Sequence, residues 1–132
     1  MSLDWKYKVA LKDEGVYKKI EADRNTEVPQ EVKDFIAENN GATPSKYKFK
    51  AGDDERVFGA VLSFNENEAD GDSVFTALGA VEDKNLLPFG IDPFGNYICY
   101  RLSDKAVAFE EQESKEQTST NMGLEEFINS LY

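Results

Sequence analysis

Residues 87–102, with the sequence LPFGIDPFGNYICYRL, combine a core-like apolar composition with two prolines and two glycines near their beginning. These prolines and glycines restrict the backbone more than any other feature of the chain. The tetrapeptide Asp-Pro-Phe-Gly at residues 92–95 fits a type I β-turn, in which Asp is favoured first, Pro second and Gly fourth. We therefore predict a chain reversal there, with a bulge if Gly95 or Asn96 takes a positive φ.

The reversal predicts a three-stranded meander. Its first two arms are residues 86–91 and 96–102, and a second polar turn leads to a third arm that begins at Ala106. The central arm has apolar or aromatic residues on both of its faces, so we expect both faces to be covered. The first arm contains Pro88 and Gly90, which a regularly paired strand disfavours, and we predict an edge position or a bulge for it.

Two amphipathic helices are predicted outside the meander. The first covers residues 29–40, with Pro29 suited to the first helical position and Gly41 expected to end the helix in the left-handed region. The second covers residues 123–131, where apolar residues recur at i, i+3, i+4 and i+7, and Asn121 is its predicted cap.

Weaker patterns complete the prediction. Shorter helices are expected at residues 14–22 and 74–81, the latter capped by Asp72 or Ser73, and residues 113–120 are expected to form a polar loop. Alternating or β-rich runs predict strands at residues 5–11, 46–51 and 56–64, the last two as a hairpin. We expect one α+β domain spanning residues 1–132, with a mainly antiparallel twisted sheet of about five or six strands and helices packed against it.

Composition excludes several kinds of chemistry. The chain has no histidine and a single cysteine, which excludes His-dependent triads, the usual zinc sites and an internal disulfide. Cys99 lies in an apolar run and is expected in the core. A calcium loop at residues 66–73 is disfavoured, because its twelfth position is Ala77 instead of a bidentate Glu. We predict a non-enzymatic protein with no metal and no cofactor.

Charge is unevenly distributed. The net charge is −11, and residues 51–132 hold 17 acidic against 5 basic side chains, whereas residues 1–50 are nearly neutral. Nucleic-acid binding is disfavoured, because phosphates require a basic face. The acidic half is suited either to a basic protein partner or to solubility alone. The residues we expect to contact a partner are Asp53, Asp54, Glu55, Glu110, Glu111 and Glu113.

The ordered series of motifs resembles the SUKH superfamily, which includes bacterial immunity proteins and the yeast cell-wall assembly regulator. The likeness covers roughly residues 15–132 and departs at Pro93-Phe94, where the family has a glycine pair, and at Val28. The matching residues are expected to mark the fold and not a catalytic site. They are Pro29, Gly41, Leu87, Pro88, Phe89, Asp92, Gly95, Asn96 and Tyr97, followed by Val107, Phe109 and Glu110.

The resemblance implies a cytoplasmic immunity protein that binds and neutralises a cognate toxin, often a nuclease. The alternatives are a regulatory protein-binding module without a toxin partner, or a small-molecule-binding protein. For the last, Phe89, Phe94, Tyr97 and Tyr100 are candidate pocket residues, although their alternation favours a place in the core. No apolar run approaches the roughly 18–20 residues of a membrane span, so no membrane partner is expected. Self-association is left open.

Overall fold

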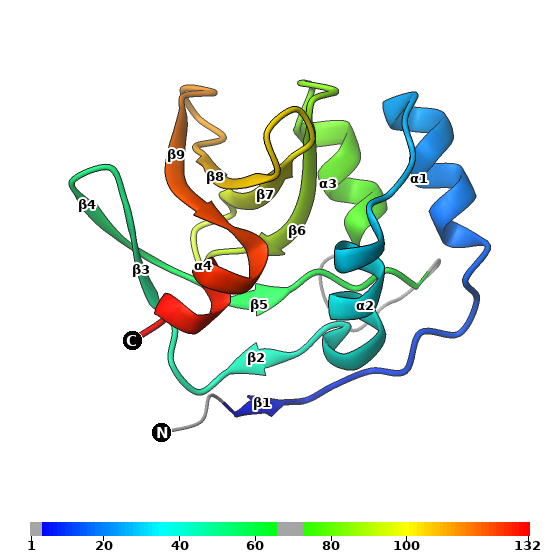
Figure 1. The fold of residues 1–132 in the computed structure, drawn as a ribbon, viewed down its shortest axis with the longest axis horizontal. Helices are drawn as coiled ribbons and strands as arrows, with labels where there is room; N and C mark the ends of the chain where they lie inside the picture. The colour runs from blue at the N-terminus through cyan, green and yellow to red at the C-terminus, as the bar shows by residue number, and fades with distance from the viewer. Residues whose placement is uncertain (1–3, 66–72) are drawn as a thin grey trace.

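The computed structural model describes residues 4–65 and 73–132, which form the α+β arrangement of Figure 1. The helices of this part are α1 (Val16–Arg24), α2 (Gln30–Asn39), α3 (Val74–Ala80) and α4 (Leu124–Ser130). The strands are β1 (Trp5–Lys6), β2 (Thr43–Pro44), β3 (Lys48–Ala51), β4 (Asp54–Val57), β5 (Ala60–Val61), β6 (Leu86–Ile91), β7 (Tyr97–Arg101), β8 (Ala106–Glu110) and β9 (Gln117–Gly123). None of the described helices is long and apolar enough to cross a membrane.

The main sheet has five antiparallel strands in the order β5-β6-β7-β8-β9. Two further sheets, β1-β2 and β3-β4, have two strands each. The predicted meander is the centre of the main sheet. Tyr97, Ile98, Cys99 and Tyr100 of β7 are all buried, so both faces of this strand are covered as expected. The pairing register shifts between Pro88 and Gly90 of β6, which confirms the bulge.

The β6–β7 turn has the predicted chemistry. The Gly95 amide donates to the Asp92 carbonyl oxygen at 3.3 Å, and Gly95 has a φ of 86°. One Asp92 carboxylate oxygen also accepts from the amides of Phe94 (2.9 Å) and Asn96 (2.7 Å). Asp92 therefore holds the turn through its side chain as well as its backbone. These hydrogen bonds explain why the acidic side chain of Asp92 can be buried, with 6% of its surface exposed.

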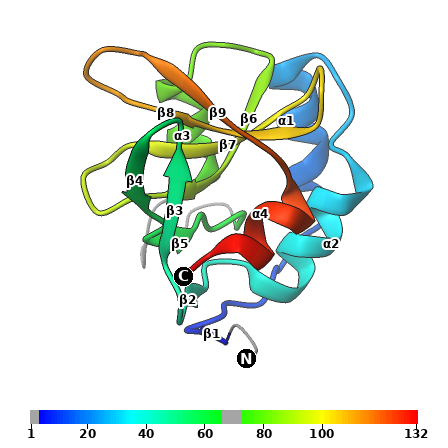
Figure 2. The same cartoon turned by 60° about the vertical axis from the view of Figure 1, so that its left-hand side comes forward.

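Helix boundaries also follow the predicted signals. Pro29 precedes α2 by one residue with a φ of −59°, and Gly41 takes a φ of 69° just after the helix. The Ser73 hydroxyl accepts a hydrogen bond from the Phe75 amide and caps α3. Figure 1 shows α1 and α3 side by side, and Figure 2 shows α2 and α4 next to each other.

Aromatic rings fill the space between these helices and the sheet. Phe58 and Phe89 have ring centroids 6.1 Å apart, and Phe49 and Phe127 approach to 5.0 Å with a steep interplanar angle. All four are buried. Such pairs add roughly 0.5–1.5 kcal/mol each beyond the burial of their apolar area, so the core joins β3, β6 and α4 firmly.

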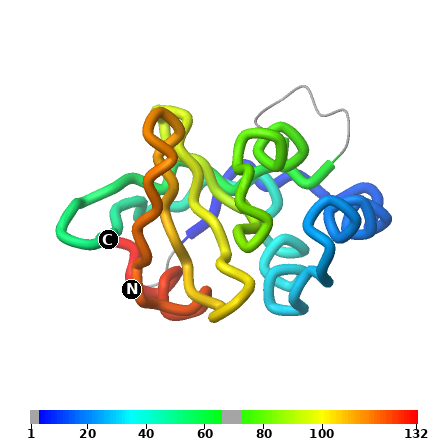
Figure 3. The backbone as a smooth tube through the Cα atoms, turned by 90° about the horizontal axis from the view of Figure 1, so that it is seen from above, coloured from blue at the N-terminus to red at the C-terminus, as the bar shows by residue number. Residues whose placement is uncertain are grey.

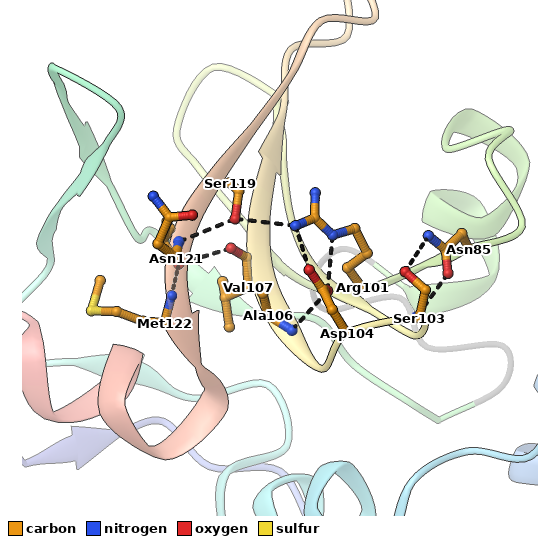
Figure 4. Close-up of polar contacts among 10 residues, drawn as sticks. Asn85, Arg101, Ser103, Asp104, Ala106, Val107, Ser119, Asn121 and Met122 are labelled. Atoms are coloured by element: carbon orange, nitrogen blue, oxygen red, sulfur yellow. Dashed lines mark hydrogen bonds and ion pairs between the residues drawn. The ribbon is translucent and has the colours of Figure 1, made fainter.

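The polar loop predicted at residues 113–120 is wrong in its second half, because residues 117–123 form β9, the edge strand of the sheet. An edge strand with one half-buried face tolerates Ser, Thr and Gln, so the apolar alternation was missing. The Thr120 hydroxyl donates to the Val107 carbonyl at 2.8 Å, as the contacts around β9 in Figure 4 illustrate. Asn121 has a φ of 61° inside β9, and Gly123, not Asn121, is the cap residue of α4.

Two of the predicted strands are shorter or divided in the structure. The run predicted at residues 5–11 pairs only over Trp5–Lys6. The run predicted at residues 56–64 is divided, because β4 ends at Val57 and β5 begins at Ala60. Gly59 lies between them, and a Cβ there would approach the Ile91 carbonyl oxygen to 2.8 Å. This close approach of two backbones turns the chain from the β3-β4 hairpin into the main sheet.

Candidate partner-binding surface

The β3–β4 turn presents the first group of predicted partner-binding acids. Gly52, with a φ of 63°, allows the tight reversal between the strands. Asp53, Asp54 and Glu55 follow it and are all exposed. The Glu55 carboxylate accepts a hydrogen bond from the Tyr132 hydroxyl at 2.8 Å, so the end of the chain lies against this hairpin.

The β8–β9 loop carries the second group. Its backbone is closed by two hydrogen bonds, from the Glu111 amide to the Glu116 carbonyl and from the Lys115 amide to the Glu111 carbonyl. Glu113 at the tip is exposed, and Glu111 is partly exposed. Glu110 differs from both, because it is only 2% exposed and its carboxylate accepts from the side chains of Gln112 and Gln117.

Arg56 joins these two turns. Its guanidinium donates to Glu111 at 2.9 Å and lies 3.6 Å from the Asp54 carboxylate. It also covers the ring of Phe109 at 4.7 Å from the centroid, in a cation–π geometry. The exposed acids of the two turns are therefore connected through Arg56, whereas Glu110 is buried.

A third turn borders the β8–β9 loop. The Asn96 side-chain oxygen accepts from the Gln112 amide at 2.9 Å, which fastens the β6–β7 turn to that loop. In Figure 3, which is seen from above, the β8–β9 loop, in orange, overlaps this turn, and Figure 1 shows the tip of the loop well above it. Phe94 lies in the turn and is 83% exposed, so this turn presents an uncovered aromatic ring.

We call this region the acidic turn surface, comprising Asp53, Asp54, Glu55, Phe94, Glu111, Glu113 and Glu116. Its basic side chains are Arg56, which is already paired, and Lys115, whose ammonium group donates to the Ala80 carbonyl and to Gln112. Lys50 stands opposite Glu55 in the β3-β4 register. Asp53 and Glu113 have no side-chain partner among the described residues, so their carboxylates face solvent.

Most of the residues that carry the sequence resemblance are buried, whereas Gly95 is exposed and Pro29, Gly41 and Asn96 are partly exposed. Leu87 and Phe89 are each 1% exposed, and Tyr97 is 7% exposed. Tyr100 is buried as well, with its hydroxyl donating to the Glu31 carboxylate. The aromatic residues considered as a pocket therefore belong to the core, except for Phe94. That the motif marks the fold and not a catalytic site stays a prediction.

The described residues contain neither a metal-binding cluster nor an exposed thiol. Within residues 4–65 and 73–132, no three carboxylate or thiol side chains gather in a way that would hold a metal ion. Most of the acidic run considered as a calcium loop, residues 66–72, lies outside the described part of the chain. Cys99 is completely buried, and burial raises the pKa of its thiol well above the usual value.

Sequence reasoning missed two features of this surface. In the sequence, Arg56 is only one of few positive charges. Its pairing with Glu111 could not be predicted, because the two residues are 55 positions apart. Glu110 lies on the face of β8 that carries Ala106 and Ala108, opposite Val107 and Phe109, so the alternation gave no signal that it is buried. Neither residue belongs to a local motif that would have revealed its partners.

A family comparison covers nearly the whole chain. The model of the SMI1 / KNR4 family (SUKH-1) matches residues 13–130. The chain belongs to this family. A search of curated proteins found no match. Membership of the SUKH-1 family is consistent with an immunity or a regulatory role.

Proposed function

We propose that this SUKH-1 protein is a non-enzymatic, cytoplasmic immunity protein that neutralises a basic toxin by covering it with the acidic turn surface. The observation that carries the proposal is the ion pair of Arg56 with Glu111, because it unites two acidic turns on one face. A toxin that cleaves nucleic acid has a positive groove for phosphates. A fixed acidic surface competes for such a groove and speeds the encounter by roughly 10–1,000-fold.

The chemistry of the surface supports a protein partner over a small ligand. Phe94 is exposed in the turn that contacts the β8–β9 loop, and aromatic residues are enriched at protein interfaces. Asp53 and Glu113 lie beyond the Arg56 pairing and would meet cations of the partner at the rim. Glu110, being buried, would contribute by holding Gln112 and Gln117 in place.

The test is protection against a toxin encoded beside this gene. Cells that express the toxin should survive with the wild-type protein and lose protection with Asp53→Asn/Phe94→Ser/Glu113→Gln. The matched control is Glu14→Gln/Glu27→Gln, which removes the same number of charges from exposed positions next to α1. Full protection by the triple variant would contradict the proposal.

The regulatory alternative makes a different prediction for the same proteins. A regulatory module would bind its partner through this surface without changing the survival of cells that carry the toxin. Binding of a non-toxin protein that is lost in the triple variant, together with no protection by the wild type, would favour that alternative.

A further inference from the structure

A second surface lies between α2 and α4, away from the acidic turns. An open cleft of about 470 Å³ separates these helices, and Trp5 of β1 closes one end of it. Figure 2 shows α2 and α4 next to each other, with β1 below them. No residue of the acidic turn surface lines this cleft.

The floor of the cleft is apolar. Trp5, Phe35, Leu124 and Ile128 line it, and Trp5 meets Phe35 edge to face with centroids 5.6 Å apart. Trp5 is placed there by the short β1-β2 pairing, in which it stands opposite Pro44. Three of the four floor residues are only partly buried, so the cleft leaves apolar surface in contact with water.

The rim of the cleft is acidic. Glu31, Asp34 and Glu38 follow one face of α2 at helical spacing, and Glu125 faces them from α4. No basic residue lines the cleft. Like charges three or four positions apart disfavour a helix by roughly 0.2–0.5 kcal/mol per pair, so this row of acids opposes the stability of α2.

The neighbouring groups orient the row without neutralising it. The buried Tyr100 hydroxyl donates to Glu31 and fixes that carboxylate at the rim. Gln30, a neutral side chain, donates to Asp34 at 2.9 Å. Lys33 is the only cation of α2, and it lies over the Tyr17 ring at 5.3 Å, outside the cleft lining.

We propose that this cleft binds a segment of another protein in which an apolar side chain is flanked by lysine or arginine. The apolar side chain would cover Trp5 and Phe35, and the flanking cations would reach Glu38 and Glu125. Charge complementarity selects this occupant. Phosphates of nucleic acid and anionic lipid headgroups would be repelled by the rim, and a second copy of this chain would bring a net charge of −11.

The proposal goes beyond the proposed function, because it assigns a second and separate binding surface. It adds a contact that the turns cannot supply, since the cleft offers a concave apolar floor whereas the turns are convex and polar. The protein would then have two separate binding sites, which contact either one partner or two different partners.

Trp5 is the only tryptophan of the chain, so its fluorescence reports directly on the cleft. The probe is the synthetic peptide KKLLKK, which contains no aromatic residue, and the comparison peptide is KKSSKK, which has the same charge. KKLLKK should change the Trp5 emission in a saturable manner, and KKSSKK should bind more weakly or give no change. An unchanged Trp5 spectrum with KKLLKK at millimolar concentration would overturn the proposal.

Variants locate the binding. Glu38→Gln/Glu125→Gln should weaken KKLLKK binding about three- to tenfold, as the loss of two exposed charge pairs would. Glu27→Gln/Glu126→Gln removes the same charge from exposed positions that do not line the cleft and should bind as the wild type does. Equal weakening in both variants would show binding governed by net charge alone and would overturn the assignment. Asp53→Asn/Glu113→Gln should bind KKLLKK normally, so failure here and failure of the acidic turn surface are distinguishable.

Discussion

The Arg56 guanidinium lies 2.9 Å from the Glu111 carboxylate and thereby connects the β3–β4 hairpin to the loop between β8 and β9. The hairpin is not part of the main sheet, and this ion pair and the packing of Phe49 against Phe109 help to hold it beside β9. The Tyr132 hydroxyl adds a hydrogen bond to Glu55, so Arg56 is one of several contacts that set the position of the exposed acids.

Replacing Arg56 by Ala should loosen both turns. The pair is partly exposed, so its loss should lower the free energy of unfolding by only about 1 kcal/mol or less. Amide hydrogen exchange should rise in β4 and in the β8–β9 loop, and stay unchanged in α1. Protection factors measured by NMR decide this, and unchanged exchange in either turn would show that the ion pair does not organise the surface.

Gly95→Ala should destabilise the protein by about 1 kcal/mol, because a Cβ is strained at a φ of 86°. A Cβ at this position has no atom within 4 Å, so backbone strain is the only contribution. Gly79→Ala is the matched control: its Cβ also has open space, its φ is not positive, and the change to Ala should be neutral or stabilising in a helix. Denaturant midpoints of both variants give the comparison, and equal midpoints would contradict the geometry of the turn.

Gly90→Ala should be the more damaging glycine substitution. A Cβ at Gly90 would lie 2.8 Å from the ring of Phe58, within the fully packed core, so the ring must shift. We expect a loss of about 1–3 kcal/mol by urea unfolding. The double variant Gly90→Ala/Phe58→Leu should lose less than the sum of the two single changes, and strict additivity would argue against a clash between these side chains.

Asp104 should titrate at low pH. Hydrogen bonds from the Arg101 side chain lower its pKa to about 2, as the fork in Figure 4 shows. The ordinary pKa of Asp is about 3.9, so the stabilisation is complete above that pH and is lost as pH falls toward 2. The carboxyl carbon shift of Asp104 should therefore move with a midpoint near 2. Asp104→Asn should lower stability at pH 7 but not at pH 2, and an ordinary midpoint would show that the pair is absent in solution.

The sequence predicted those parts of the fold that depend on local chemistry. Asp92 and Gly95 set the β6–β7 turn within four residues, and the apolar stripe of α4 is complete within two turns of helix. These signals need no information from the rest of the chain, and the structure confirms them.

The features that were missed depend on distant partners. The sequence of β9 is polar because its strand lies at the sheet edge, and its pairing with β8, which includes Phe109 with Thr118, reveals it as a strand. The burial of Glu110 depends on Gln117 across the loop. The cleft needs Trp5 and Ile128, which no periodicity connects. The expected acidic loops were identified by charge alone, and their adjacency through Arg56 was not predictable.

The most direct test of the central claim is the association rate with the co-encoded toxin across a salt series. Screening acts over roughly 8–10 Å at physiological ionic strength, so binding through exposed acids should slow as salt rises. Asp53→Asn/Glu113→Gln should associate more slowly than the wild type at low salt and depend less on salt, whereas Glu14→Gln/Glu27→Gln should follow the wild type. A rate that does not depend on salt, and that the turn variant leaves unchanged, would contradict the account.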